Sequence, residues 1–191
     1  MSRGFGPVAN SAGPLSLPAM FKSWFRRRER PRLQVLMVCT GNLCRSPMAE
    51  AVLRSKLAAA GLAGQVAVDS AGTHGFARGT RPDPRAVAQA QLRGYSLAGQ
   101  KSRPLDLADF QAFDLVLAMD RGNLAVLQDR CPSGEQHRLA LLLAFDKAAA
   151  SDEVPDPYFG SVDSFGAALD LIEPACDGLL ADLQRRLALA P

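Results

Sequence analysis

Cys39 and Arg45 are separated by five residues, in a short segment that could bind an anion and attack it. The segment from Cys39 to Ser46 contains Gly41 and Asn42, residue types that readily adopt the left-handed conformations that curl a loop. A loop that leads into a helix N-terminus points free backbone N–H groups and the positive end of the helix dipole at one spot. We therefore expect a phosphate-binding loop built from Thr40, Gly41, Asn42, Leu43, Cys44 and Arg45.

The two ends of this loop supply different chemistry. Arg45 carries a planar, permanently charged guanidinium that can hold two phosphate oxygens. The positive field of the loop favours the thiolate of Cys39 over the thiol, which makes Cys39 a nucleophile at neutral pH. A buried structural cysteine is the plainer interpretation of Cys39 taken alone. Its place between an apolar run and Ser46-Pro47, which is typical of a helix start, favours the catalytic interpretation. A Walker A nucleotide loop is disfavoured, because Gly-Lys-Ser/Thr is missing.

The elements that must position this loop alternate between strands and helices. Short apolar runs predict strands at 33–38, 66–68, 113–119 and 139–143. Helical spacing predicts helices at 46–61, 84–93 and 161–189. Pro174 and Gly178 are positions at which the last helix could break or kink. The alternation predicts a three-layer α/β fold with a parallel central sheet of about four strands and helices on both faces. The phosphate loop then follows the first strand, at the sheet edge where ligands bind.

Charge separates the first 32 residues from the rest of the chain. Of the net charge of +3, residues 1–32 hold seven cations and one anion, so residues 33–191 carry a net −3. We expect 1–32 to be a disordered basic N-terminal extension and 33–191 to be one catalytic domain. The catalytic domain has no basic surface for nucleic acid, so no nucleic-acid partner is expected. Aromatic and cationic residues at 21–28 could contact an anionic membrane surface, although a solvated tail is favoured.

The cysteines indicate a reducing compartment. Neither a secretory signal nor a membrane span is expected, so we predict a cytoplasmic protein with free thiols. No metal or other cofactor is predicted. Oxidation could join Cys39 and Cys44 reversibly and protect the thiolate, but Cys44 as a packed small residue fits the sequence equally well. The four cysteines are Cys39, Cys44, Cys131 and Cys176.

The stretch from Val38 to Pro47 resembles the phosphate loop of the low-molecular-weight protein tyrosine phosphatases. Further segments match in the family's order and extend the resemblance over nearly all of 33–189, but not to the first 32 residues. These segments are 69–73, 82–86, 109–120 and 154–158. The resemblance implies hydrolysis of phosphotyrosine in proteins, and of small aryl phosphates, through a phosphocysteine on Cys39.

The resemblance also assigns roles that composition leaves open. It implies that Asp156 is the general acid of the first step and the general base of the second, in a proline-rich loop that limits its motion. It implies that Ser46 bonds the Cys39 sulfur and that Asn42 and Ser70 stiffen the loop. Where many members have a supporting histidine, this chain has Gln100, which can still donate and accept hydrogen bonds. The implied pocket walls are Tyr158, Phe159 and the stretch from His74 to Phe76.

Two other functions remain as alternatives. An arsenate reductase of the same fold would need a relay of thiols on a mobile segment near the loop, and residues 80–102 contain no cysteine. A phosphate-loop module that binds phosphotyrosine without turnover would need neither a nucleophile nor an acid. The joint presence of Cys39, Arg45 and Asp156 favours the phosphatase over this binding module.

Overall fold

A computed structural model describes Met1, residues 31–75 and residues 78–189. Of the extension expected at 1–32, residues 2–30 therefore lie outside the described part. Along the chain the elements are β1 (Leu33–Cys39), α1 (Arg45–Ala59), β2 (Val66–Gly72), α2 (Pro84–Leu92), α3 (Asp109–Ala112), β3 (Leu115–Ala118), α4 (Arg121–Arg130), the 3-10 turn η2 (Gln136–Arg138), β4 (Leu139–Leu141), the 3-10 turn η3 (Leu142–Phe145) and α5 (Val162–Leu189).

The strands of the described part form one parallel sheet of four, in the order β2-β1-β3-β4. The predicted α/β fold is thereby confirmed. β1 is an inner strand that pairs over its whole length with β2, from Leu33 with Val66 to Cys39 with Gly72. On its other side β1 pairs with β3. The phosphate loop therefore leaves the sheet from an inner strand, flanked by the carboxyl ends of two neighbours.

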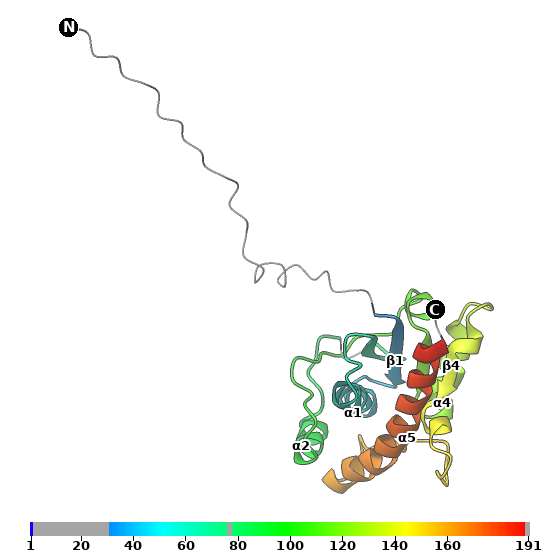
Figure 1. The fold of residues 1–191 in the computed structure, drawn as a ribbon. Helices are drawn as coiled ribbons and strands as arrows, with labels where there is room; N and C mark the ends of the chain where they lie inside the picture. Colours follow the sequence, from blue (N-terminus) through cyan, green and yellow to red (C-terminus); the bar gives the residue numbers. More distant parts are fainter. Residues whose placement is uncertain (2–30, 76–77, 190–191) are drawn as a thin grey trace.

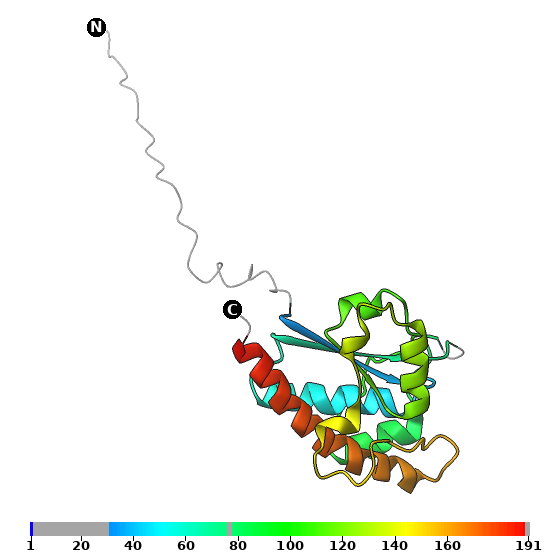
Figure 2. The same ribbon diagram turned by 90° about the vertical axis from the view of Figure 1, so that its right-hand side faces the viewer.

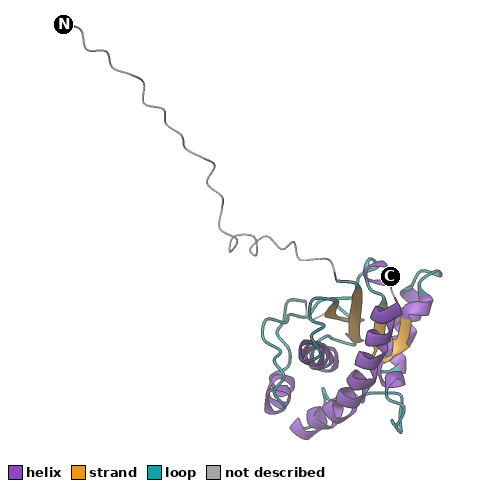
Figure 3. Cartoon of the chain, viewed as in Figure 1, coloured by secondary structure: helices purple, strands orange, loops and turns teal. Residues whose placement is uncertain are grey.

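Helices cover both faces of the sheet, as Figure 1 and Figure 2 show. Alternate residues of β1 point to opposite sides, because successive side chains of a strand do so. Val35 and Met37 join the core formed with α1 and α5, whereas Leu36 and Val38 join a second core that includes Phe110 of α3 and residues of α4. A strand buried on both faces is apolar without alternation, which explains its continuous apolar run. Figure 3 shows the strands enclosed between the helices.

Several elements, among them the unpredicted helix α3, differ from the sequence-based expectations. The strand expected at 139–143 ends at Leu141 and continues as η3. α4 was not predicted. α5 runs without interruption through Pro174 and Gly178, because its buried residues keep helical spacing against the core on both sides of the proline. At Gly178 a Cβ would overlap the backbone oxygen of Phe145, so this glycine permits a close packing of α5 and does not end it.

Candidate active site

The loop between β1 and α1 is built around Asn42. Among the described non-glycine residues, Asn42 alone has a positive φ, of 54°, while Gly41 lies outside that region. The Asn42 Nδ2 donates to Ser46 Oγ and to Ser70 Oγ, each at 2.9 Å. Its Oδ1 accepts from the Arg103 backbone N–H at 2.9 Å. One side chain therefore ties the loop to α1, to β2 and to the segment after residue 100, which offsets the cost of the left-handed conformation.

The sulfur of Cys39 lies inside this loop. Cys39 is 3% exposed, and its Sγ lies 3.1 Å from Ser46 Oγ. The Asn42 backbone N–H donates to the same sulfur at 3.3 Å. Donors of this kind stabilise a thiolate. Cys44 differs, because burial, followed by the neighbouring Cys39, raises the pKa of its thiol to about 12. At neutral pH Cys44 is therefore a thiol, which leaves Cys39 as the candidate nucleophile of the loop.

Arg45 joins the phosphate loop to the loop that carries Asp156. Its side chain is 2% exposed, and its Nη1 donates to Asp120 Oδ2 at 2.5 Å and to the Val154 backbone oxygen at 3.0 Å. Its Nη2 lies 2.7 Å from Asp156 Oδ2 and 3.4 Å from Thr40 Oγ1. The Arg45 Nε is buried and has no hydrogen-bond partner in the described part of the chain. It is a donor that an oxygen of a bound phosphate can satisfy.

A cavity of about 420 Å³ opens onto the loop. Its described lining residues are Cys39, Thr40, Gly41, Leu43, Cys44, Asp156, Tyr158 and Phe159. The Tyr158 and Phe159 rings meet edge to face, with centroids 5.0 Å apart, and form an apolar side of the cavity. Of the other residues expected as walls, His74 is exposed and is not among the lining residues, and Phe76 lies outside the described residues.

The start of α2 connects the two loops of the site. The Asp83 backbone N–H donates to the Leu43 oxygen at 2.9 Å, and the Asp83 carboxylate binds the Arg85 guanidinium at 2.8 Å. That hydrogen bond lowers the pKa of Asp83. Arg85 in turn donates to the backbone oxygens of Tyr158 at 3.0 Å and Gly160 at 3.1 Å. Its guanidinium also lies 4.6 Å from the centre of the Phe165 ring. Asp83 and Arg85 thus fix the position of the loop that carries Asp156 relative to the phosphate loop.

Further residues support the loop from behind. Ser70 Oγ donates to Glu50 Oε2 at 2.5 Å, and burial raises the pKa of this glutamate. Gln100 Nε2 donates to the Pro47 backbone oxygen at 3.2 Å, so Gln100 holds the first turn of α1. Gly72 lies directly beneath the loop, where a Cβ would be 2.9 Å from the Thr40 oxygen and 3.1 Å from the Asn42 nitrogen.

Sequence reasoning missed Asp120, Glu50 and the pair of Asp83 and Arg85. Asp120 had a usable signal, because it follows a buried parallel strand and therefore lies at the same sheet edge as Cys39. The other three depend on contacts between segments that are distant in the chain. Within residues 31–75 and 78–189, no three histidine, cysteine or acidic residues gather as a metal site would require. None of the helices described here is long and apolar enough to span a membrane.

Comparison with known proteins gives consistent matches. The family model described as low molecular weight phosphotyrosine protein phosphatase matches residues 34–189. A low molecular weight protein-tyrosine-phosphatase of Streptomyces coelicolor is 41% identical over 157 residues, which cover 81% of this chain and 95% of that protein. The corresponding Schizosaccharomyces pombe protein is 40% identical over 135 residues, covering 70% and 86% of the two chains.

Solved structures agree with these matches. A crystal structure of a protein tyrosine phosphatase from Entamoeba histolytica superimposes with a TM-score of 0.78 at 37% identity, covering 80% of this chain and 97% of that one. A low molecular weight phosphotyrosine phosphatase from Vibrio cholerae gives a TM-score of 0.75 at 40% identity, covering 81% and 98%. The likeness therefore includes both the sequence and the fold.

Proposed function

This chain belongs to the low molecular weight phosphotyrosine protein phosphatases, and we propose that Cys39, Arg45 and Asp156 perform the two chemical steps of its phosphatase reaction. The observation that carries the assignment is the position of Arg45, which contacts both Thr40 of the nucleophile's loop and the Asp156 carboxylate. A phosphate held by Arg45 therefore lies between a sulfur nucleophile and a carboxyl group. This arrangement suits nucleophilic displacement with general acid catalysis.

In the first step the Cys39 thiolate attacks phosphorus. An S–P bond forms and the bond from phosphorus to the phenolic oxygen breaks, while protonated Asp156 gives its proton to that oxygen. The products are a neutral phenol and a phosphocysteine. The backbone N–H groups of the loop, the Arg45 guanidinium and the helix dipole stabilise the charge on the equatorial oxygens.

In the second step the Asp156 carboxylate accepts a proton from water. The oxygen of that water attacks phosphorus, the S–P bond breaks, and inorganic phosphate leaves. The Cys39 thiolate is restored with Asp156 again protonated, so the cycle closes without a cofactor. Ser46 lies 3.1 Å from the sulfur and can donate to the thiolate each time it leaves phosphorus.

Phosphotyrosine is the proposed substrate because of the cavity's apolar side. Tyr158 and Phe159 line the cavity together with Cys39, and a phenyl ring can pack against them while its phosphate reaches the loop. A phosphoserine side chain is shorter and has no ring to bury there. We expect phosphotyrosine peptides to be cleaved with much higher kcat/KM than phosphoserine peptides of the same sequence.

Two observations speak against an arsenate reductase relay. Cys176 is fully buried in α5, where burial raises its pKa to about 12, and neither Cys176 nor Cys131 lines the catalytic cavity. A thiol that returns the nucleophile to its reduced state must reach Cys39. Arsenate-dependent oxidation of thioredoxin by this protein would favour the reductase instead.

Hydrolysis of p-nitrophenyl phosphate tests the central assignment. The wild type should release p-nitrophenol and form a phosphocysteine that rapid acid quenching traps. Cys39→Ser should lower kcat by several orders of magnitude, while Cys131→Ser, which changes another buried thiol away from the cavity, should leave it unchanged. Activity that survives in Cys39→Ser would refute the mechanism. A wild type that binds phosphotyrosine without turnover would instead be a binding module.

We infer that the catalytic domain works without the extension, in a reducing compartment such as the cytoplasm. Ordered contacts already begin at Arg32, whose backbone N–H donates to the Gln65 oxygen at 2.8 Å. A chain that lacks residues 1–30 and keeps the Arg32 contact should therefore retain full turnover, and a large loss would show that those residues contribute to catalysis. Sedimentation of the full chain with anionic vesicles would show whether residues 21–28 contact membranes; no sedimentation is expected of a solvated tail.

A further inference from the structure

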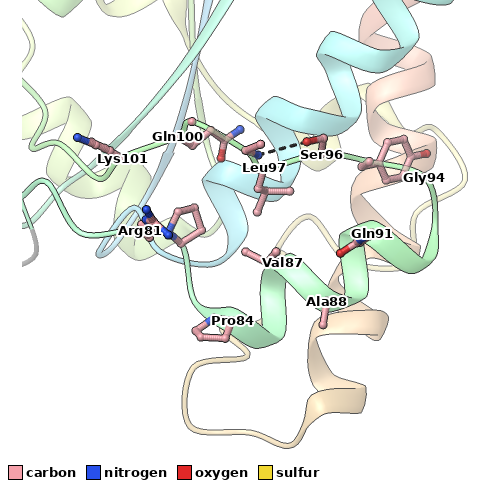
Figure 4. Close-up of a pocket in the computed structure, with 14 residues that line it drawn as sticks. Arg81, Pro84, Val87, Ala88, Gln91, Gly94, Ser96, Leu97, Gln100 and Lys101 are labelled. Atoms are coloured by element: carbon pink, nitrogen blue, oxygen red, sulfur yellow. Dashed lines mark hydrogen bonds between the residues drawn. The ribbon is translucent and has the colours of Figure 1, made fainter.

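A second and larger cavity lies beside α2, as Figure 4 shows. It has a volume of about 910 Å³ and contains none of Cys39, Arg45 and Asp156. We call it the α2 pocket. Its size lies within the range of about 300–1,000 Å³ that is usual for ligand sites. Its lining residues are Arg81, Pro82, Pro84, Val87, Ala88, Gln91 and residues 94–101.

One face of α2 forms an apolar side of this pocket. Pro84, Val87 and Ala88 follow one another at helical spacing on that face. The opposite face of α2 buries Ala86 and Ala90 in the core. Across the pocket, Leu97 is buried as part of the same core. The pocket therefore offers a firm apolar surface that no described segment of the chain covers.

The charges around the pocket have one sign. Arg81 and Lys101 are its only charged lining residues, and both are exposed. Neither forms a hydrogen bond or an ion pair with another described residue, although most arginines of the domain are paired with carboxylates. Because residues 33–191 carry a net −3, this cationic pair is a local exception. It is complementary to an anionic ligand.

Gln100 adds an unsatisfied acceptor. Its Nε2 donates to the Pro47 oxygen at 3.2 Å, which fixes the amide, while its Oε1 is buried and has no partner in the described part of the chain. Figure 4 shows that oxygen on the side that faces α2. A buried acceptor is costly unless a donor reaches it. A peptide can supply a backbone N–H there, which the carboxylate and alkyl chain of a fatty acid cannot.

The α2 pocket adjoins the catalytic cavity. Asp83 lies between Pro82 and Pro84 of the pocket and donates its backbone N–H to the Leu43 oxygen at 2.9 Å, and Leu43 lines the catalytic cavity. From these features we propose that the α2 pocket docks an acidic and apolar segment of the phosphoprotein substrate, flanking the phosphotyrosine. The proposal rests on the phosphatase function and adds a substrate class to it.

Two phosphotyrosine peptides test the proposal, one with Glu and Leu in its flanks and one with Lys and Ser at the same positions. At low ionic strength, kcat/KM should be about tenfold higher for the acidic and apolar peptide, and added salt should reduce the difference. Arg81→Glu/Lys101→Glu should abolish or reverse this preference while hydrolysis of p-nitrophenyl phosphate stays unchanged. Arg130→Glu/Lys147→Glu makes the same change of net charge away from the pocket and should keep the preference.

Several outcomes would overturn the proposal. Equal kcat/KM for both peptides, or a preference that persists in Arg81→Glu/Lys101→Glu, would show that the pocket does not select substrates. An equal loss of the preference in both double variants would indicate that net charge alone determines it. A dimer that forms in the ultracentrifuge and disappears in Arg81→Glu/Lys101→Glu would identify a second copy of the chain as the occupant.

The result can be separated from a failure of the proposed function. If the wild type does not hydrolyse p-nitrophenyl phosphate, the phosphatase assignment fails, and the pocket is then tested by binding alone. Fluorescence anisotropy of the two labelled peptides on Cys39→Ser protein should show tighter binding of the acidic and apolar peptide. Equal binding there would overturn the docking site independently of turnover.

Discussion

The phosphate loop and the loop that carries Asp156, which we call the acid loop, meet at Arg45, but they are held in different ways. The phosphate loop is fixed by bonds of the buried Asn42, both within its own strand–loop–helix unit and to Ser70 and Arg103 in other segments. The Asp156 side chain is 45% exposed, and its loop is held by arginines that lie 111 and 73 residues away in sequence. The proposed nucleophile is thus positioned by a network centred on one buried side chain, and the proposed acid by bonds from two arginines at a more exposed position. Changes to each loop should therefore have different kinetic signatures.

Among the changes considered below, removal of the Asp156 carboxylate should lower kcat/KM the most. Asp156→Ala should lower kcat/KM for phenyl phosphate by about 10³-fold, because general acid catalysis contributes about 10²–10⁴-fold. The kcat/KM for p-nitrophenyl phosphate should fall less, since departure of its leaving group depends less on protonation. Asp152→Ala removes an exposed carboxylate of a nearby segment, paired with Arg121, and should leave both rates unchanged. Equal losses on both substrates would contradict the assigned role.

A single methyl group added beneath the phosphate loop, at Gly72, should cause the second-largest loss of kcat/KM. In Gly72→Ala the new Cβ would contact backbone atoms of Thr40 and Asn42, so the loop must shift. We expect kcat/KM to fall by about 10²-fold for good and poor leaving groups alike, because misplacement of the nucleophile affects both. Gly64→Ala is the control, since nothing lies within 4 Å of its Cβ. Circular dichroism should show intact folds; an unchanged rate in Gly72→Ala would show that the loop adapts.

Loss of the arginine that holds the acid loop should be milder and selective. Arg85→Gln removes the bonds to the Tyr158 and Gly160 oxygens, and kcat/KM for phenyl phosphate should fall about tenfold, with a smaller change for p-nitrophenyl phosphate. Arg93→Gln is matched, because Arg93 bonds α2 to the Gly166 oxygen of α5 away from the site. A loss that is equal for both substrates would indicate a general structural defect.

The ion pair between Asp83 and Arg85 should also make the stability of the fold depend on pH. Arg85 lowers the pKa of Asp83, so the folded state holds the proton less tightly than the unfolded chain. The stabilisation is therefore present above the unfolded pKa of about 4 and is lost as pH falls through the lower folded value. Asp83→Asn keeps an acceptor for the α2 N-terminus, and should cost about 1 kcal/mol at pH 7 and less near pH 3. Denaturant unfolding at pH 7 and at pH 3 measures this loss of stability. A loss that does not depend on pH would contradict the contribution of the ion pair.

The smallest effect is expected at Gln100. Gln100→His changes the group that holds Pro47 in the first turn of α1, two residues from the loop. We expect kcat to change by less than about fivefold, since the Asn42 network does not include Gln100. A rise of several orders of magnitude would show that glutamine leaves the native loop poorly formed.

The sequence was most informative where structure is local. The run at 33–38, the residue types of the loop and the Ser46-Pro47 helix start together predicted the nucleophile's unit with nearly correct bounds. The sheet order could be inferred only as far as parallel strands, because pairing depends on long-range contacts. Glu50, Asp83 and Arg85 were missed for the same reason, whereas Asp120 had a usable signal because it follows a buried strand. Gly178 was misleading, since the sequence does not distinguish a glycine required for close packing against Phe145 from a glycine that ends a helix.

The inner position of β1 has a consequence for cooperativity. Its amides and carbonyls are paired with β2 on one side and β3 on the other, and its side chains are buried in both cores. Opening β1 alone would expose all of these groups at once, so it belongs to the part of the domain whose hydrogen exchange requires global unfolding. The phosphate loop, which follows directly after Cys39, is attached to that part of the domain. Catalytic competence and the fold should therefore be lost together, in one transition.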